Sequence, residues 1–150
     1  MAYTLSSRSL AKLEGVNEDL VKVVKRAIEL TKIDFGVIYG MRTQEEQQKL
    51  FDAGKSQTMK SKHLTGDAVD LMAYVDGKAS WELNLYDDLA DAMKWAASEN
   101  DTKIRWGAAW HIPDITEWGG NMEEAMMSYI DLRRSEGRRP FIDGPHFELN

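Results

Sequence analysis

The sequence predicts an α+β domain with a small antiparallel sheet packed against helices. Helical and strand-like segments follow one another without a regular β-α alternation, which argues against a parallel sheet. The 150 residues are 43% hydrophobic, a content that suits one sizeable core and leaves little for a second. We therefore expect a single domain over residues 1–150.

Capping residues and apolar spacing locate the helices. Ser7, Asn17 and Asn121 can each cap a first helical turn, and Thr43 with Glu46 forms a capping-box pattern. Apolar residues at helical spacing follow these caps and mark one more helix in the middle of the chain. The helices are expected near residues 7–13, 18–31, 44–53, 86–97 and 122–136.

Short apolar segments bounded by turn residues predict the strands. We expect them at Asp34–Tyr39, Ala68–Tyr74, Lys103–Trp106 and Pro145–Leu149. The polar stretch Lys55–Lys62 is expected to be a loop. The stretch Gly107–Gly120, which contains glycines, a proline and two tryptophans, is expected to be an ordered loop that shapes a site.

Composition excludes several classes of function. The chain has no cysteine, so any bound metal must be held by His, Asp or Glu. The net charge of -6 argues against a broad electrostatic grip on nucleic acid or on an anionic membrane. No apolar run approaches the roughly 20 residues that span a bilayer, and the N-terminus lacks the apolar core of a signal peptide. We expect no nucleic-acid partner and no stable membrane association.

Two histidine-containing segments carry candidate chemistry. His63 precedes a glycine turn, and Asp70 follows inside an apolar strand, where an unpaired carboxylate is costly to bury. Pairing with a cation or a metal removes this cost, and His63 can reach the same centre. Near the other end of the chain, His146 and Glu148 share one face of the last strand, and Asp143 lies on the turn before it.

Two histidines and one carboxylate can form a three-ligand zinc site that leaves a fourth position for water. A nearby carboxylate can take a proton from that water and return it to a leaving amine, and Asp143 is the candidate for this role. Each of these residues, taken singly, is compatible with a structural or solvent-exposed role. Their combination indicates a site for Zn²⁺ at His63, Asp70 and His146, with purely structural side chains as the alternative.

Seven residues follow a spacing that can be compared with known families: Ser61-x-His63-x-x-Gly66-x-Ala68-x-Asp70 and, much later, Asp143-x-x-His146. This pattern resembles the signature of the LAS-type, VanY-like zinc peptidases, which include D-alanyl-D-alanine carboxypeptidases and dipeptidases. Within that group, Gly40-x-Arg42-Thr43 and the ending Gly144-Pro145-His146-Phe147-Glu148-Leu149 are similar to phage L-alanyl-D-glutamate endopeptidases, the single-domain endolysins. The similarity extends over nearly the whole chain.

The resemblance implies the LAS-type fold, shared with hedgehog and DD-peptidase domains, and no separate cell-wall-binding domain. It implies zinc ligation by His63, Asp70 and His146, and general base and acid catalysis by Asp143. The implied substrate is the L-alanyl-D-glutamate bond of the peptidoglycan stem peptide, cut during phage lysis of the host. We expect a monomer that is made in the host bacterial cytoplasm and reaches the periplasmic wall after a holin-type partner permeabilises the membrane.

Three further assignments each have an alternative. Arg42 matches the family arginine that polarises the scissile carbonyl and stabilises the oxyanion, and the alternative is a surface ion pair with Glu45 or Glu46. Ser61 matches a serine near the substrate, or it satisfies a loop backbone group. Trp106, in a Trp-Gly-Ala-Ala-Trp stretch similar to a family motif, is expected to wall the substrate cleft, or else it completes the core.

Rival readings of the site and of the function remain open from sequence. His111 is a rival ligand, although it has no neighbouring carboxylate, and Glu148 is a rival base that can instead orient a ligand. The rival functions are a D-alanyl-D-alanine carboxypeptidase, a metal-free muramidase using carboxylates such as Glu45 or Glu117, and a zinc-stabilised wall-binding module without turnover.

Overall fold

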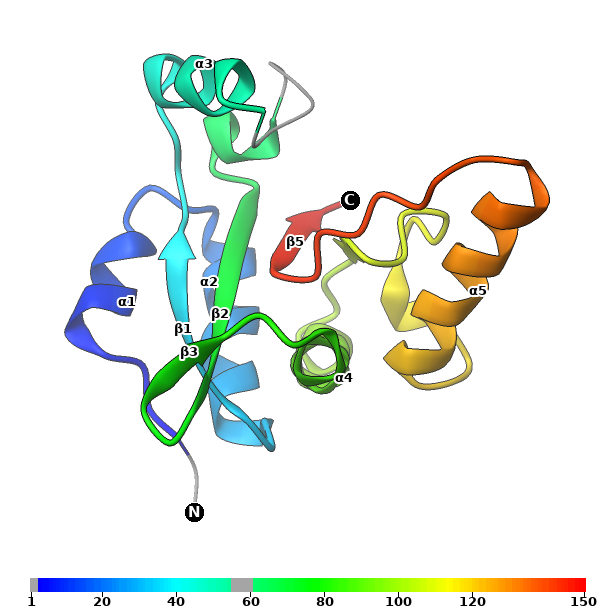
Figure 1. The fold of residues 1–150 in the computed structure, drawn as a ribbon. Coiled ribbons are helices and arrows are strands. Elements are labelled where there is room, and N and C mark those ends of the chain that lie inside the picture. Colours follow the sequence, from blue (N-terminus) through cyan, green and yellow to red (C-terminus); the bar gives the residue numbers. More distant parts are fainter. Residues whose placement is uncertain (1–2, 55–60) are drawn as a thin grey trace.

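The computed structural model of the chain describes residues 3–54 and 61–150. Their fold has the predicted class: helices packed on a small antiparallel sheet (Figure 1). The predicted loop Lys55–Lys62 falls largely outside the described residues. No helix in the described part of the chain combines the length and the apolar character needed to cross a membrane.

The sheet is centred on one long strand. Its strands are β1 (Asp34–Tyr39), β2 (Ala68–Val75), β3 (Lys78–Ser80), β4 (Ile104–Trp106) and β5 (His146–Leu149). All pairings are antiparallel, in the order β1-β2-β5-β4, with β3 paired to the far end of β2. The sequence did not predict β3, a three-residue strand that forms because Asp76 and Gly77 adopt positive φ angles of 52° and 77° in a tight hairpin turn.

Among the described residues, four of the five α-helices begin at or beside a predicted cap, and α4 begins without a side-chain cap. They are α1 (Ser7–Lys12), α2 (Glu18–Leu30), α3 (Gln44–Asp52), α4 (Leu83–Glu99) and α5 (Met122–Ser135), with two short 3-10 helices, η1 (Lys62–Thr65) and η2 (Ile115–Glu117). Asn17, Thr43 and Asn121 are N-caps as predicted. The predicted cap of α1 is wrong by one residue, because the hydroxyl of Ser6 accepts the hydrogen bond from the backbone of Ser9.

One face of β2 forms the core with α2 and α4. Val69 and Leu71 of β2 and Phe147 of β5 are fully buried there among the apolar residues of both helices. Because side chains alternate along a strand, Asp70 points to the opposite face of the sheet. The apolar helices therefore support the strands from one side while the polar side chains of β2 and β5 gather on the other.

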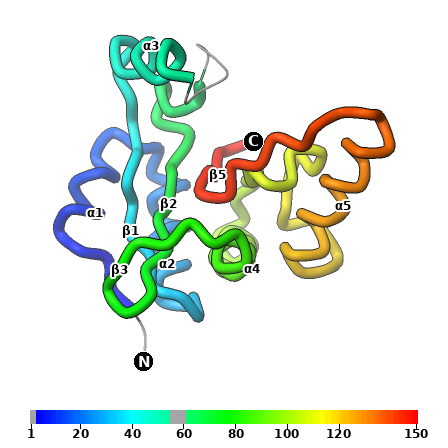
Figure 2. Tube along the Cα trace, viewed as in Figure 1, coloured from blue at the N-terminus to red at the C-terminus, as the bar shows by residue number. Residues whose placement is uncertain are grey.

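The last strand lies beside a segment far away in the sequence. Figure 2 shows the C-terminal segment running next to β2, on the side of the molecule below α3. In this pairing Asp70 lies directly opposite His146. The sheet register therefore brings the two histidine-containing segments into one place.

Candidate metal centre

Three side chains that the sequence singled out converge at the start of β2. His63 of η1, Asp70 of β2 and His146 of β5 each offer one ligand atom, and these atoms lie within 4.8 Å of one another. The Oδ1 atom of Asp70 is 3.2 Å from Nε2 of His63 and 3.1 Å from Nδ1 of His146. The structure thus brings together all three predicted ligands.

Local backbone geometry places these side chains. The 3-10 helix that carries His63 ends at Gly66, whose φ of 77° lies in the left-handed region that glycine adopts without strain. A Cβ atom at Gly66 would lie only 2.4 Å from the carbonyl oxygen of Gly15. Asp70 and His146 need no such device, because they are direct neighbours across the β2–β5 pair.

The two histidines present different ring nitrogens to the centre. Nδ1 of His63 donates to the carbonyl oxygen of Gly40 at 2.7 Å, which leaves Nε2 facing Asp70. In His146 the arrangement is reversed, because Nε2 contacts the Glu148 carboxylate at 2.8 Å and Nδ1 faces Asp70. Each ring is therefore held through the nitrogen that points away from the centre.

The donor set fits a zinc ion. Two imidazole nitrogens and a carboxylate oxygen are ligands that zinc accepts, and a catalytic zinc site typically has three protein ligands. Tetrahedral ligands at roughly 2.0–2.1 Å from zinc lie about 3.3 Å from one another. The contacts of 3.2 Å and 3.1 Å between Asp70 and the two histidines are close to that separation.

The electrostatic environment of the cluster favours a bound cation. Burial would raise the pKa of Asp70, but hydrogen bonds and charges from His146 and His63 hold it well below its usual value. Burial would likewise lower the pKa of His146, yet Asp70 and Glu148 raise it to about 9. A buried carboxylate that stays ionised between two imidazoles is the environment that a bound cation needs.

Arg42 is buried at the edge of this cluster. Its Nη2 atom lies 3.3 Å from Oδ2 of Asp70, its Nη1 atom donates to Oε1 of Gln47 at 2.8 Å, and its guanidinium lies over the ring of Tyr39. The side chain is only 8% exposed. The alternative of a surface ion pair with a neighbouring glutamate of α3 is wrong for the described residues, because the carboxylate that Arg42 pairs with is Asp70.

Asp143 lies on the turn before β5 and feels the charges of the cluster. Burial first, and then the negative charge of Asp70, raise the pKa of Asp143, while the positive charges of His146, His63 and Arg42 act in the opposite direction. The net shift is upward. A carboxyl group with a raised pKa is better matched to proton transfer near neutral pH than an ordinary aspartate.

The model of the family described as phage L-alanyl-D-glutamate peptidase matches residues 1–150 of the chain. The chain belongs to this family. The L-alanyl-D-glutamate peptidase of Escherichia phage T5 is 35% identical over 153 residues, which cover 99% of each chain. The crystal structure of the Serratia marcescens L-Ala D-Glu endopeptidase ChiX matches with a TM-score of 0.71 and 34% identity, over 96% of this chain and 87% of that one.

A more distant structure shares the fold alone. The vancomycin resistance D,D-dipeptidase VanXYg matches with a TM-score of 0.50 and 17% identity, over 89% of this chain and 50% of that one. Together these matches confirm the predicted family and fold class of the peptidase.

One predicted site residue of the peptidase is buried in the core. Trp106 is fully buried, stacks on Phe147 and donates its indole N–H to the carbonyl oxygen of Gly144 at 2.7 Å. The prediction that Trp106 walls the cleft is therefore wrong, since the apolar side of β4 faces the core. Trp110 is the tryptophan that contacts the cluster, with its ring 5.4 Å from that of His146.

Two other candidates have structural roles in the peptidase. The hydroxyl of Ser61 accepts a hydrogen bond from the backbone N–H of His63 at 3.2 Å, so it caps η1, and its contact with substrate stays a prediction. His111 lies apart from the cluster and its Nε2 atom contacts the hydroxyl of Ser128 at 3.1 Å. The Ser61 contact fixes the start of the 3-10 helix that carries His63, and the His111 contact joins the segment after β4 to α5.

Sequence reasoning missed the role of Gly107. Its N–H donates to the carbonyl oxygen of His146, and its carbonyl oxygen accepts from the N–H of Asp143, both at 2.8 Å. A Cβ atom there would lie 2.2 Å from the carbonyl oxygen of Asp143. The Trp-Gly pair after a strand was the available signal, because a glycine there permits close approach of another backbone.

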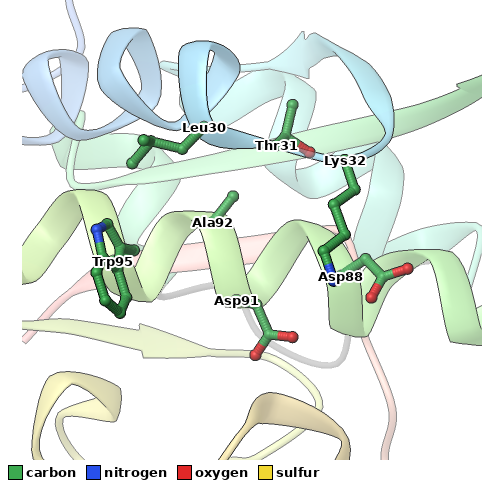
Figure 3. Close-up of a pocket in the computed structure, with 7 residues that line it drawn as sticks. All are labelled: Leu30, Thr31, Lys32, Asp88, Asp91, Ala92 and Trp95. Carbon is green, nitrogen blue, oxygen red and sulfur yellow. The ribbon is translucent and has the colours of Figure 1, made fainter.

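A surface hollow elsewhere on the peptidase lies away from the predicted metal ligands. It lies between the end of α2 and the outer face of α4, and Figure 3 shows Lys32 extending toward Asp88 across it. Trp95 forms one wall. None of the three predicted metal ligands lines it.

Proposed function

We propose that the chain is a zinc peptidase that hydrolyses the L-alanyl-D-glutamate bond of peptidoglycan stem peptides. The observation that carries the proposal is the convergence of His63, Asp70 and His146 next to a carboxyl group and a fixed cation. Asp143 supplies the carboxyl group and Arg42 the cation. A zinc-stabilised binding module has no need of either.

The chain's own residues divide the catalytic work. His63, Asp70 and His146 would hold a zinc ion, which when bound would act as a Lewis acid toward a carbonyl oxygen and lower the pKa of water. Asp143 takes the proton from the attacking water and delivers it to the leaving amine, a role that its raised pKa favours. Arg42, held by Gln47 and Asp70, stabilises the negative charge that develops on the carbonyl oxygen without having to move.

The choice of bond is supported by the relatives. The names of the phage T5 protein and of ChiX specify the L-alanyl-D-glutamate bond, and both proteins resemble this chain over most of its length. The likeness to a D,D-dipeptidase is at a level of identity that supports only a common fold. We therefore favour the L-alanyl-D-glutamate bond over a D-alanyl-D-alanine bond.

We also propose that the peptidase is a monomeric endolysin made in the host cytoplasm. In this proposal, a holin-type partner permeabilises the membrane and gives the peptidase access to the periplasmic wall. Family membership supports this route. Expression in a Gram-negative host with and without a holin should give rapid lysis only in the first case, and equal lysis in both would contradict the route.

Metal analysis combined with fragment analysis tests the catalytic proposal. The purified protein should contain one zinc per chain, and digestion of peptidoglycan should produce fragments with a new N-terminal D-glutamate, identified by mass spectrometry. Chelation should abolish this product and zinc should restore it. Release of terminal D-alanine would instead support a carboxypeptidase, and full lysis after thorough chelation would support a metal-free muramidase.

A further inference from the structure

His146 is held between two carboxylates, and only one of them belongs to the predicted ligand set. Its Nδ1 atom faces Asp70 at 3.1 Å, and its Nε2 atom contacts Oε1 of Glu148 at 2.8 Å. Glu148 lies two residues further along β5 on the same face, and its side chain is only 11% exposed. A short contact between two buried polar groups indicates a specific role for Glu148.

Glu148 is itself held from a second direction. Nζ of Lys62 lies 3.4 Å from Oε2 of Glu148, and the same ammonium group donates to the carbonyl oxygen of Leu149. Lys62 immediately precedes His63 in η1. The series Lys62–Glu148–His146 therefore ties the 3-10 helix that carries one predicted ligand to the strand that carries another.

The contact at Nε2 decides which nitrogen of His146 is free. A neutral imidazole has one N–H donor and one lone pair. A carboxylate at Nε2 accepts a hydrogen bond only if Nε2 carries the proton, which leaves the lone pair on Nδ1, the atom that faces Asp70. The negative charge of the carboxylate also makes the imidazole a stronger donor to a metal.

We propose that Glu148 is a positioning residue, which keeps His146 in the tautomer and orientation that present Nδ1 to the metal, and that Lys62 holds Glu148 in place. This inference rests on the proposed metal site. It assigns Glu148 no direct part in catalysis, because one carboxylate oxygen contacts Nε2 on the side of the ring away from the centre and the other contacts Lys62.

Zinc affinity provides the first test. Chelator competition should show that Glu148→Ala binds zinc about 10–100-fold more weakly than the wild type, as expected when a carboxylate partner of a ligating histidine is lost. Glu148→Gln should recover much of the affinity, because its amide oxygen still accepts from Nε2. Lys62→Met should fall in between, and Glu99→Ala, which removes an ion pair with Arg26 on another part of the surface, should match the wild type.

The imidazole nitrogen signals provide a readout that a purely structural role would not move. With only three histidines in the chain, ¹⁵N spectra of the zinc-loaded protein can be assigned by single substitutions. His146 should show a protonated Nε2 in the wild type and in Glu148→Gln. In Glu148→Ala this signal should broaden or shift toward a mixture of tautomers, while the signals of His63 stay in place.

Several results would overturn the inference. Zinc affinity of Glu148→Ala within twofold of the wild type, with unchanged His146 signals, would show that the contact positions nothing. Loss of turnover in Glu148→Gln at saturating zinc, with wild-type affinity, would make Glu148 a catalytic base instead. If Glu148→Ala does not fold, the zinc affinities of Glu148→Gln and Lys62→Met are compared with that of the wild type instead. Unchanged zinc affinity in Lys62→Met would show that Lys62 does not hold Glu148 in place.

Failure of the proposed function has a different signature. A wild-type protein that binds no zinc would refute the metal site whatever the variants do. The metal-free spectra, recorded at a pH where the ring is neutral, would then still report whether Glu148 fixes the tautomer of His146. Zinc binding by the wild type therefore tests the proposed metal site, and the nitrogen spectra of the same samples test the role of Glu148.

Discussion

Replacing Gly107 with alanine should impair catalysis and metal binding together, although Gly107 contributes no side chain to the site. A Cβ atom at this position would lie 2.2 Å from the carbonyl oxygen of Asp143 and 3.0 Å from Cβ of His146. Real Cβ atoms essentially never approach closer than 3.0 Å, so the turn that carries Asp143 must move by about 0.8 Å.

The size of the effect follows from what that movement disturbs. The two backbone hydrogen bonds of Gly107, to Asp143 and to His146, are both 2.8 Å long. Weakening both should lower the free energy of unfolding by about 1–3 kcal/mol, at roughly 0.5–1.5 kcal/mol each. A misplacement of a catalytic group by about 1 Å can cost ~10²-fold in rate, and we expect a loss of that order in hydrolysis of a defined stem peptide.

The assay compares Gly107→Ala with a matched glycine variant. Gly119→Ala is the control, because no atom lies within 4 Å of a Cβ atom built there. Hydrolysis rate, zinc affinity and thermal unfolding should be near wild type in the control and all reduced in Gly107→Ala. Wild-type hydrolysis by a folded Gly107→Ala protein would refute the argument that this backbone contact sets the positions of Asp143 and His146.

Three further outcomes are expected. Asp143→Asn should reduce hydrolysis by ~10²–10⁴-fold because the amide cannot take a proton, while zinc content stays at the wild-type level; a wild-type rate would exclude Asp143 as the base. Burial and neighbouring carboxylates raise the pKa of Asp87 to about 6, so its charge destabilises the folded state above that pH. Asp87→Asn should therefore raise the free energy of unfolding by about 1–2 kcal/mol at pH 7.5, a gain that should shrink as the pH falls from about 6 towards about 4; a loss of stability at pH 7.5 would contradict this. In the metal-free protein, burial lowers the pKa of His146 but its carboxylate partners raise it to about 9. The folded state then binds this proton more tightly than the unfolded state, so the protonated His146 stabilises the fold fully below about pH 6.5. This contribution, about 3 kcal/mol at most, is lost as the pH rises through 9 and is measured by denaturant titration. A free energy of unfolding that does not fall between pH 7 and 10 would refute the prediction.

Local patterns along the chain were sufficient to predict most of the secondary structure. The strand Asp34–Tyr39 and the capping box at Thr43 and Glu46 agree with the structure residue for residue. Capping and strand patterns succeed because they reflect the hydrogen bonding and sterics of neighbouring residues. The three-residue strand β3 escaped prediction because it is too short to show an apolar pattern of its own, although its turn with β2 is local.

The sequence by itself determined which residues were candidates for the site. His63, Asp70 and His146 stand out from sequence because a carboxylate inside an apolar strand needs a partner and because their spacing matches a known motif. Asp143 follows from its place beside His146. Such candidates are fixed by residue type and by short-range spacing, both of which a single sequence contains.

Only the tertiary structure decided how these residues meet and what surrounds them. The β2–β5 register places Asp70 opposite His146 across 76 positions of sequence, and it turns Trp106 into the core. The partner of Arg42 and the contact of Glu148 with His146 likewise depend on which strands and helices become neighbours. These contacts depend on sheet pairing and core packing over the whole chain, which local spacing does not specify.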